Sequence, residues 1–153
     1  EQIKLKEGNK SVLGGVPASL PSLVKASRMQ DKAAQVGFDW EKKDDVWKKV
    51  IEEIEEMNEI EKIKSQTSDK KDLKELNLKL EKEVGDVFFA LVNYARFLGV
   101  NPEDALRLTN EKFIKRFNYV QQKVKETGKA INESNLEEMD IYWNESKKLN
   151  GFN

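Results

Sequence analysis

The chain has 153 residues, the size of one ordinary domain with a core of its own. Its 27 basic and 28 acidic residues nearly cancel, so it lacks the strong positive field of a protein that binds nucleic acid regardless of sequence. The absence of Cys and His excludes disulfides, thiol and Ser-His-Asp catalysis, and the zinc and di-iron centres built from these residues. Any metal is therefore expected to be a hard cation held by oxygen.

No stretch approaches the roughly 18 consecutive apolar residues of a membrane span, and the N-terminus lacks the apolar core of a signal peptide. The sequence therefore predicts a soluble, cytoplasmic protein with neither a membrane nor a nucleic acid as partner. Because the chain begins without Met, we interpret it as the C-terminal part of something longer.

Residues 1–18 mix charges with glycine and proline and show no sustained period. They are expected to form a flexible segment before a helical domain over residues 19–150. A first helix is predicted to start near Pro21, which suits the first helical position, and to stop at Gly37, a left-handed cap. Residues 38–40 then form a connector.

A second helix is predicted to begin after Asp44 or Asp45 and to run to about Lys64. The polar residues 65–71 read as a loop. A third, long helix is expected over about residues 72–98, because apolar residues recur there with a helical period.

A fourth helix is predicted to open at Pro102 and to close near Gly128. Ser134 with Glu137 has the spacing of a capping box for a fifth helix that ends near Asn150. Nothing reads as a pair of strands, so the predicted fold is all-α, a bundle of four to five helices.

The second and third helices each carry two acids three residues apart at the edge of an apolar stripe: Glu53 with Glu56, and Glu83 with Asp86. An unpaired carboxylate in that position costs several kcal/mol, on the order of other buried charges, so a cation is expected between them. Two antiparallel helices with this pattern bring all four carboxylates to one spot. A cluster made only of carboxylates suits Mg²⁺ or Mn²⁺.

The other acids of the second helix, Glu52, Glu55 and Glu59, are predicted to point toward solvent, which is the usual role of a charged face.

The main stripe of the third helix consists of Leu73, Leu76, Leu80, Val84, Val87, Leu91 and Leu98. Residues 84–98 are in fact apolar nearly all round. In so small a domain a second subunit is the expected cover for such a helix, which predicts a homodimer.

Polar and basic residues flank these acids. Lys79 and Asn93 lie on the same side of the third helix as its acidic pair, and Lys112 and Arg116 lie one turn apart on the fourth. Cations beside a metal centre are what a polyphosphate requires, so the set indicates phosphoryl transfer or hydrolysis. The alternative is that these cations only pair with nearby acids on the surface.

The ordered motifs Glu-Glu-x-x-Glu at 52–56 and Glu-x-x-Asp at 83–86 resemble those of the MazG family of nucleoside triphosphate pyrophosphohydrolases. Three further segments resemble the same family: 36–40, 85–93 and 110–117. The similarity covers about residues 15–149 and is to the C-terminal half of longer MazG chains. One departure is the polar insertion at 65–71, which lengthens the gap between the two motifs.

The resemblance implies an all-α dimer or tetramer that converts a nucleoside triphosphate and water into the monophosphate and pyrophosphate with Mg²⁺. It implies metal ligation by Glu53, Glu56, Glu83 and Asp86, phosphate binding by Lys79, Lys112 and Arg116, and base stacking by Trp143. Core or interface packing is the alternative for Trp143. Either Glu52 or Glu53 is predicted to accept the proton of the attacking water.

The sequence is therefore interpreted as a metal-dependent hydrolase of ribo- or deoxyribonucleoside triphosphates. Two alternatives remain. One is a base-selective dUTP or dCTP diphosphatase of the same superfamily, and the other is a non-catalytic helical dimerisation module whose acids hold a structural ion.

Overall fold

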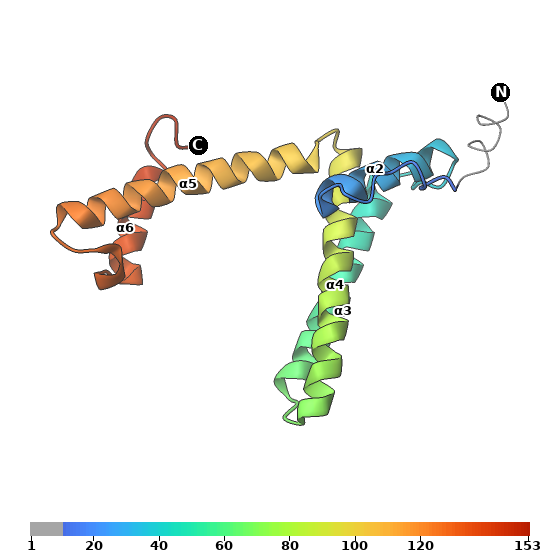
Figure 1. Ribbon diagram of the computed structural model, residues 1–153, viewed down its shortest axis with the longest axis horizontal. Coiled ribbons are helices and arrows are strands. Elements are labelled where there is room, and N and C mark those ends of the chain that lie inside the picture. Colours follow the sequence, from blue (N-terminus) through green and yellow to red (C-terminus); the bar gives the residue numbers. More distant parts are fainter. Residues whose placement is uncertain (1–10) are drawn as a thin grey trace. The chain divides into compact units, whose positions relative to one another are not determined.

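The computed structural model describes residues 11–153 (Figure 1). This part of the chain forms five α-helices and one short 3-10 helix without strands, which confirms the all-α class. The described residues divide into two compact units, of which the first extends to Glu103 and the second covers Asp104–Asn153. Of the expected N-terminal segment 1–18, residues 1–10 lie outside the described part, and residues 11–18 consist mainly of turns.

The first unit consists of α2 (Ser22–Gln35), α3 (Lys43–Ser65) and α4 (Lys70–Phe97). α3 and α4 lie side by side and antiparallel along their length, and α2 packs on α4 near the end where α3 begins (Figure 1). All three helices occur where the sequence predicts them, with ends that differ by about two residues at most.

The end of α2 redirects the chain toward α4. Gly37 has a φ of 90°, a left-handed conformation that favours glycine. Its N–H donates to the Ala34 carbonyl at 3.0 Å, and the N–H of Phe38 donates to the Ala33 carbonyl at 3.0 Å. These two bonds satisfy the last carbonyls of the helix, so the predicted cap at Gly37 is confirmed.

The break between α3 and α4 is shorter than the predicted loop, since it covers only residues 66–69. Asp69 ends it as the N-cap of α4, because its side chain accepts a hydrogen bond from the N–H of Asp72 at 3.0 Å. The cap adds two residues to the helix that were expected in the loop.

The buried apolar side chains of the described part of the first unit come from the α3–α4 pair: Val46, Val50, Ala90 and Val92. Toward the C-terminal end of the predicted α4 stripe, Leu91 and Leu98 are 41% and 50% exposed in the single chain, on the surface where a second subunit is the expected cover. The reason is that α3 covers only one face of this part of α4 within the chain. No helix among residues 11–153 combines the length and apolarity that crossing a membrane requires.

The second unit contains nearly all of α5 (Pro102–Glu126), the 3-10 helix η1 (Ile131–Glu133) and α6 (Leu136–Ser146). Its fully buried side chains are Val120 and Val124 of α5 and Ser146 of α6. α5 begins at Pro102, as predicted, and α6 ends about four residues before the expected position.

The predicted capping box of α6 is wrong by one residue. Asn135 is the N-cap, and its side chain accepts a hydrogen bond from the N–H of Glu138 at 2.9 Å. The Ser134 hydroxyl instead donates to the Glu138 carboxylate at 2.8 Å. Ser and Asn both cap well, so the choice depends on where the preceding η1 turn ends.

Candidate active site

The α3–α4 pair brings three acids together. Glu53 and Glu56 lie one turn apart on α3, and Glu83 comes from α4. One carboxylate oxygen of each lies within 4.8 Å of the others. Three of the four acids expected to hold a metal therefore converge, as two antiparallel helices with this spacing require.

Two oxygens of this carboxylate cluster (Glu53, Glu56 and Glu83) are buried and unsatisfied. Glu53 is only 7% exposed, and its Oε2 has no hydrogen-bond partner. The Oε2 of Glu83 is also buried and has no hydrogen-bond partner among the described residues. Buried carboxylate oxygens without partners are unfavourable by several kcal/mol, whereas a hard divalent cation satisfies them. The donor set, made only of carboxylate oxygens, fits Mg²⁺ or Mn²⁺.

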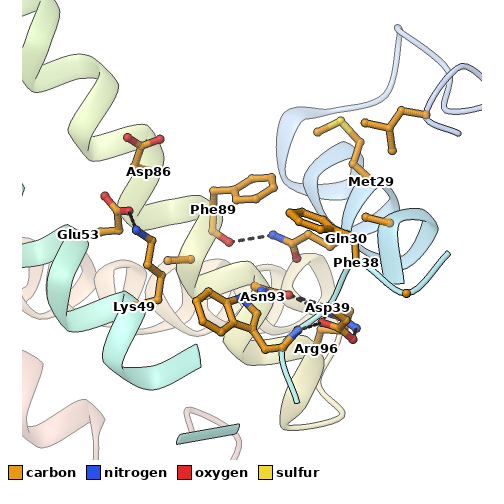
Figure 2. Close-up of a pocket in the computed structure, with 15 residues that line it drawn as sticks. Met29, Gln30, Phe38, Asp39, Lys49, Glu53, Asp86, Phe89, Asn93 and Arg96 are labelled. Carbon is orange, nitrogen blue, oxygen red and sulfur yellow. Dashed lines mark hydrogen bonds and ion pairs between the residues drawn. The ribbon is translucent and has the colours of Figure 1, made fainter. Parts of the chain in front are cut away.

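Lys49 stands beside the cluster, one turn before Glu53 on α3. Its ammonium lies 2.9 Å from the Glu53 carboxylate (Figure 2). The same ammonium lies 3.1 Å from the Glu52 carboxylate. The hydrogen bond to Glu53 is the main cause of the raised pKa of Lys49. Glu52 is exposed, as predicted, yet its carboxylate reaches the same ammonium. A single lysine leaves the cluster with excess negative charge.

That excess is visible in the pKa of Glu56, which is raised above its ordinary value. The largest cause is the negative charge of Glu53, followed by loss of solvent and then by the charge of Glu83. The site therefore favours any added positive charge, whether a proton or a metal ion.

Asp86, the fourth expected ligand, lies one turn after Glu83 and lines the same pocket as Glu53 (Figure 2). It is not part of the group of three oxygens within 4.8 Å. Lys79 is exposed on α4, one turn before Glu83. The ligand role of Asp86 and the phosphate role of Lys79 stay predictions.

A pocket of about 660 Å³ opens next to the cluster, within the first unit. Its walls are mainly apolar and come from α2, the connector 38–40 and α4, with Met29, Phe38 and Phe89 among them (Figure 2). Lys49, Glu53 and Asp86 also line it. The volume falls in the range of small-molecule sites.

An ion pair fixes the connector on α4. Both terminal nitrogens of the Arg96 guanidinium donate to the two Asp39 oxygens, one of them at 3.0 Å (Figure 2). Arg96 also donates to Asn93 Oδ1 at 2.9 and 3.2 Å. The Asp39 carboxylate accepts from the Trp40 N–H at 2.8 Å, and its pKa is lowered chiefly by the hydrogen bond from Arg96. Asn93, predicted to bind substrate, lines the pocket with its oxygen held by Arg96.

Three predicted substrate-binding residues belong to the second unit. The Arg116 guanidinium donates to the Phe152 carbonyl at 2.9 Å and lies 5.6 Å from the centre of the Trp143 ring. The Trp143 ring also packs 5.5 Å from that of Phe113. Lys112 is half-buried on α5, one turn before Arg116. The structure thus brings Arg116 and Trp143 into contact.

Sequence reasoning missed several residues of the pocket. Lys49 was detectable, since it stands four residues before Glu53, the favourable spacing for an ion pair on a helix. Arg96 and Asp39 are 57 positions apart and carry no local pattern. Gln30 is a single polar residue of α2, and its burial beside the pocket follows only from how α2 packs on α4.

Residues 42–121 match the family model described as the MazG nucleotide pyrophosphohydrolase domain, a segment that contains the whole carboxylate cluster. The chain belongs to the MazG family. This confirms the resemblance that the acidic motifs indicate.

Three relatives of the MazG chain extend the similarity beyond the matched domain. The nucleoside triphosphate pyrophosphohydrolase of Escherichia coli is 39% identical over 152 residues, which are 97% of this chain and 54% of that protein. The nucleoside triphosphate pyrophosphohydrolase/pyrophosphatase MazG of Thermotoga maritima is 37% identical over 150 residues, 96% of this chain and 53% of that protein. The uncharacterized protein YabN of Bacillus subtilis is 46% identical over 151 residues, 97% of this chain and 29% of that protein. The chain spans about half the length, or less, of the curated relatives it matches.

Proposed function

We propose that this MazG chain hydrolyses nucleoside triphosphates to the monophosphate and pyrophosphate in a reaction that depends on Mg²⁺. The observation that carries the proposal is the carboxylate cluster, with two buried oxygens that lack partners, at the edge of a pocket large enough for a nucleoside. The printed names of the Escherichia coli and Thermotoga maritima relatives support the same reaction.

In this proposal Glu53, Glu56 and Glu83 hold the metal, with Asp86 as a further ligand from the next turn of α4. A divalent cation supplies Lewis acidity and neutralises the charge that develops on the phosphates. Glu53 keeps one oxygen on Lys49 and offers the other to the metal, so Lys49 orients this ligand. The arrangement explains why one glutamate has both a lysine partner and a free buried oxygen.

Glu52 fits the role of proton acceptor better than Glu53. Its carboxylate is exposed and forms an ion pair with Lys49, as the Glu53 carboxylate does. Glu52 is not among the three acids whose oxygens converge. A general base needs a free oxygen near the attacking water. We therefore propose that Glu52 accepts the proton while Glu53 serves as ligand.

Lys79, Lys112 and Arg116 are proposed to bind the phosphates, Arg116 through its fork-like guanidinium. Trp143 was expected to stack on the base. Its contacts with Phe113 and Arg116 support the alternative, packing within the second unit. Three further expectations stay predictions: Mn²⁺ as the alternative to Mg²⁺, the cytoplasmic location, and the domain bounds 19–150.

A homodimer is proposed from the apolar surface of α4. Phe88 and Leu91 in the C-terminal half of this helix, and Leu98 at its C-cap, are 60%, 41% and 50% exposed. Monomers rarely leave so many large apolar side chains uncovered on one element, and a second copy of this chain is the occupant we propose. Sedimentation of the wild type and of Phe88→Lys tests this: a dimeric wild type and a weakened variant support it, and a monomeric wild type contradicts it.

Pyrophosphate release from a panel of nucleoside triphosphates, with and without Mg²⁺, tests the activity. Release from several bases only with Mg²⁺ is expected. Release from dUTP or dCTP alone favours the base-selective alternative. No release from any triphosphate contradicts the proposed function and favours a non-catalytic dimerisation module.

A further inference from the structure

We propose that the pocket beside the carboxylate cluster holds the nucleobase of the substrate, and that Gln30 accepts a hydrogen bond from an N–H group of that base. This inference rests on the proposed function and deepens it, because it names the residue that contacts the part of the substrate farthest from the reacting phosphates.

Gln30 is fixed and incompletely satisfied. It is 6% exposed on α2, and its Nε2 donates to the Phe89 carbonyl of α4 at 2.9 Å (Figure 2). This bond determines which end of the amide is the donor, so Oε1 is left as the acceptor. Oε1 is buried and has no partner among the described residues.

A buried amide oxygen without a donor costs about 1–3 kcal/mol. A ligand that brings an N–H group recovers this energy, and a ligand without one leaves the oxygen unpaired. The site therefore has the property that gives hydrogen-bonding pockets their selectivity: a missing ligand donor weakens binding.

The surroundings of Gln30 suit a flat aromatic ring. Met29, Phe38, Trp40 and Phe89 line the pocket and provide apolar and aromatic surface for the faces of a base. Every nucleobase carries at least one N–H or NH₂ donor on its hydrogen-bonding edge. The pocket thus offers surface for the ring and a buried acceptor for its edge.

The position of the pocket beside the carboxylate cluster also determines how a bound nucleotide is oriented. Lys49, Glu53 and Asp86 line it together with Gln30, so the carboxylate cluster and the free amide oxygen serve the same cavity. A nucleotide with its base against Gln30 directs its phosphates toward the acids that are proposed to hold the metal. The Arg96–Asp39 ion pair keeps the connector with Phe38 and Trp40 in place as the wall.

The test compares nucleoside triphosphates with methyl triphosphate, which has the phosphates but no base. Gln30→Leu removes the acceptor, and Gln35→Leu on the exposed surface of α2 is the matched control. We expect Gln30→Leu to lower kcat/KM for nucleoside triphosphates about 10-fold or more, mainly through KM, with no comparable loss for methyl triphosphate. An equal loss for both substrates, or no loss for either, overturns the inference.

A binding measurement separates this inference from the proposed function. Trp40 lines the pocket, so a nucleoside monophosphate bound there is expected to quench the protein's fluorescence, and Trp40→Phe is expected to remove that signal. Gln30→Leu is expected to weaken this binding about 10-fold. Binding that is unchanged in Gln30→Leu, or lost in Trp143→Leu instead, overturns the pocket inference. A protein that binds the monophosphate but hydrolyses no triphosphate contradicts only the proposed hydrolysis.

Discussion

Replacing Asp39 by Asn is expected to destabilise the first unit of this MazG chain by about 1–2 kcal/mol at neutral pH. Arg96 donates to both Asp39 oxygens, and hydrogen bonds to charged groups contribute about 1.5–3 kcal/mol each. Asn keeps one oxygen as an acceptor and loses the charge. The two side chains are 28% and 20% exposed, so solvent screening places the effect at the low end of that range.

The effect should depend on pH with a definite sign. The pKa of Asp39 is lowered by Arg96, so this carboxylate is more acidic in the folded than in the unfolded protein. Its contribution to stability is present above the unfolded pKa of about 3.9 and is lost as pH falls through the lower folded value. The difference between wild type and Asp39→Asn is therefore expected at pH 7 and should shrink below about pH 4.

Urea unfolding followed by circular dichroism at several pH values measures this difference, with Glu61→Gln on the exposed face of α3 as the control. The control is expected to change stability by less than about 0.5 kcal/mol. A loss in Asp39→Asn that persists unchanged at pH 3, or no loss at pH 7, refutes the reasoning that the ion pair holds the connector on α4.

Three further results are expected. Glu83→Gln should lower Mn²⁺ affinity at least about 10-fold in titration calorimetry. The metal-free variant should keep or gain thermal stability, because repulsion within the carboxylate cluster decreases. An unchanged Mn²⁺ affinity contradicts the ligand assignment. Glu56→Ala and Asp86→Ala should each abolish pyrophosphate release, and near-normal activity in either removes that residue from the site. Val50→Ala, at a side chain with 0% exposure, should lower the free energy of unfolding by about 2 kcal/mol in urea, more than Ile51→Ala at 38% exposure; equal losses contradict the assigned core.

The helices could be predicted from the sequence because their signals are local. Proline at the start of α5 and glycine after α2 act within one turn of the chain, and both predicted ends occur in the structure. The α6 cap was misplaced by one residue because Ser134 and Asn135 are both good caps. Local propensity ranks such neighbours nearly equally, and the preceding turn decides between them.

The carboxylate cluster was predictable for a different reason. Helical periodicity fixes the direction of Glu53 and Glu56 on α3 and of Glu83 on α4. The antiparallel pairing of these two long helices then brings the three carboxylates together. The pocket was not predictable in this way. Gln30 and Arg96 owe their positions to the packing of α2 and of the connector on α4, which depends on contacts between residues more than 50 positions apart.

The register of α3 on α4 connects the two parts of the site. Lys49 contacts Glu53 of the cluster and also lines the pocket, so both features depend on one turn of α3. A shift of one residue along α3 would turn its side chains by about 100°, which would carry Glu53 away from Glu83 and Lys49 out of the pocket. Val46 and Val50, which are 1% and 0% exposed on the same turns of α3, oppose that shift because it would expose them. The apolar contacts that stabilise the helix pair therefore also hold three mutually repelling carboxylates in place, next to the pocket that we propose for the nucleobase.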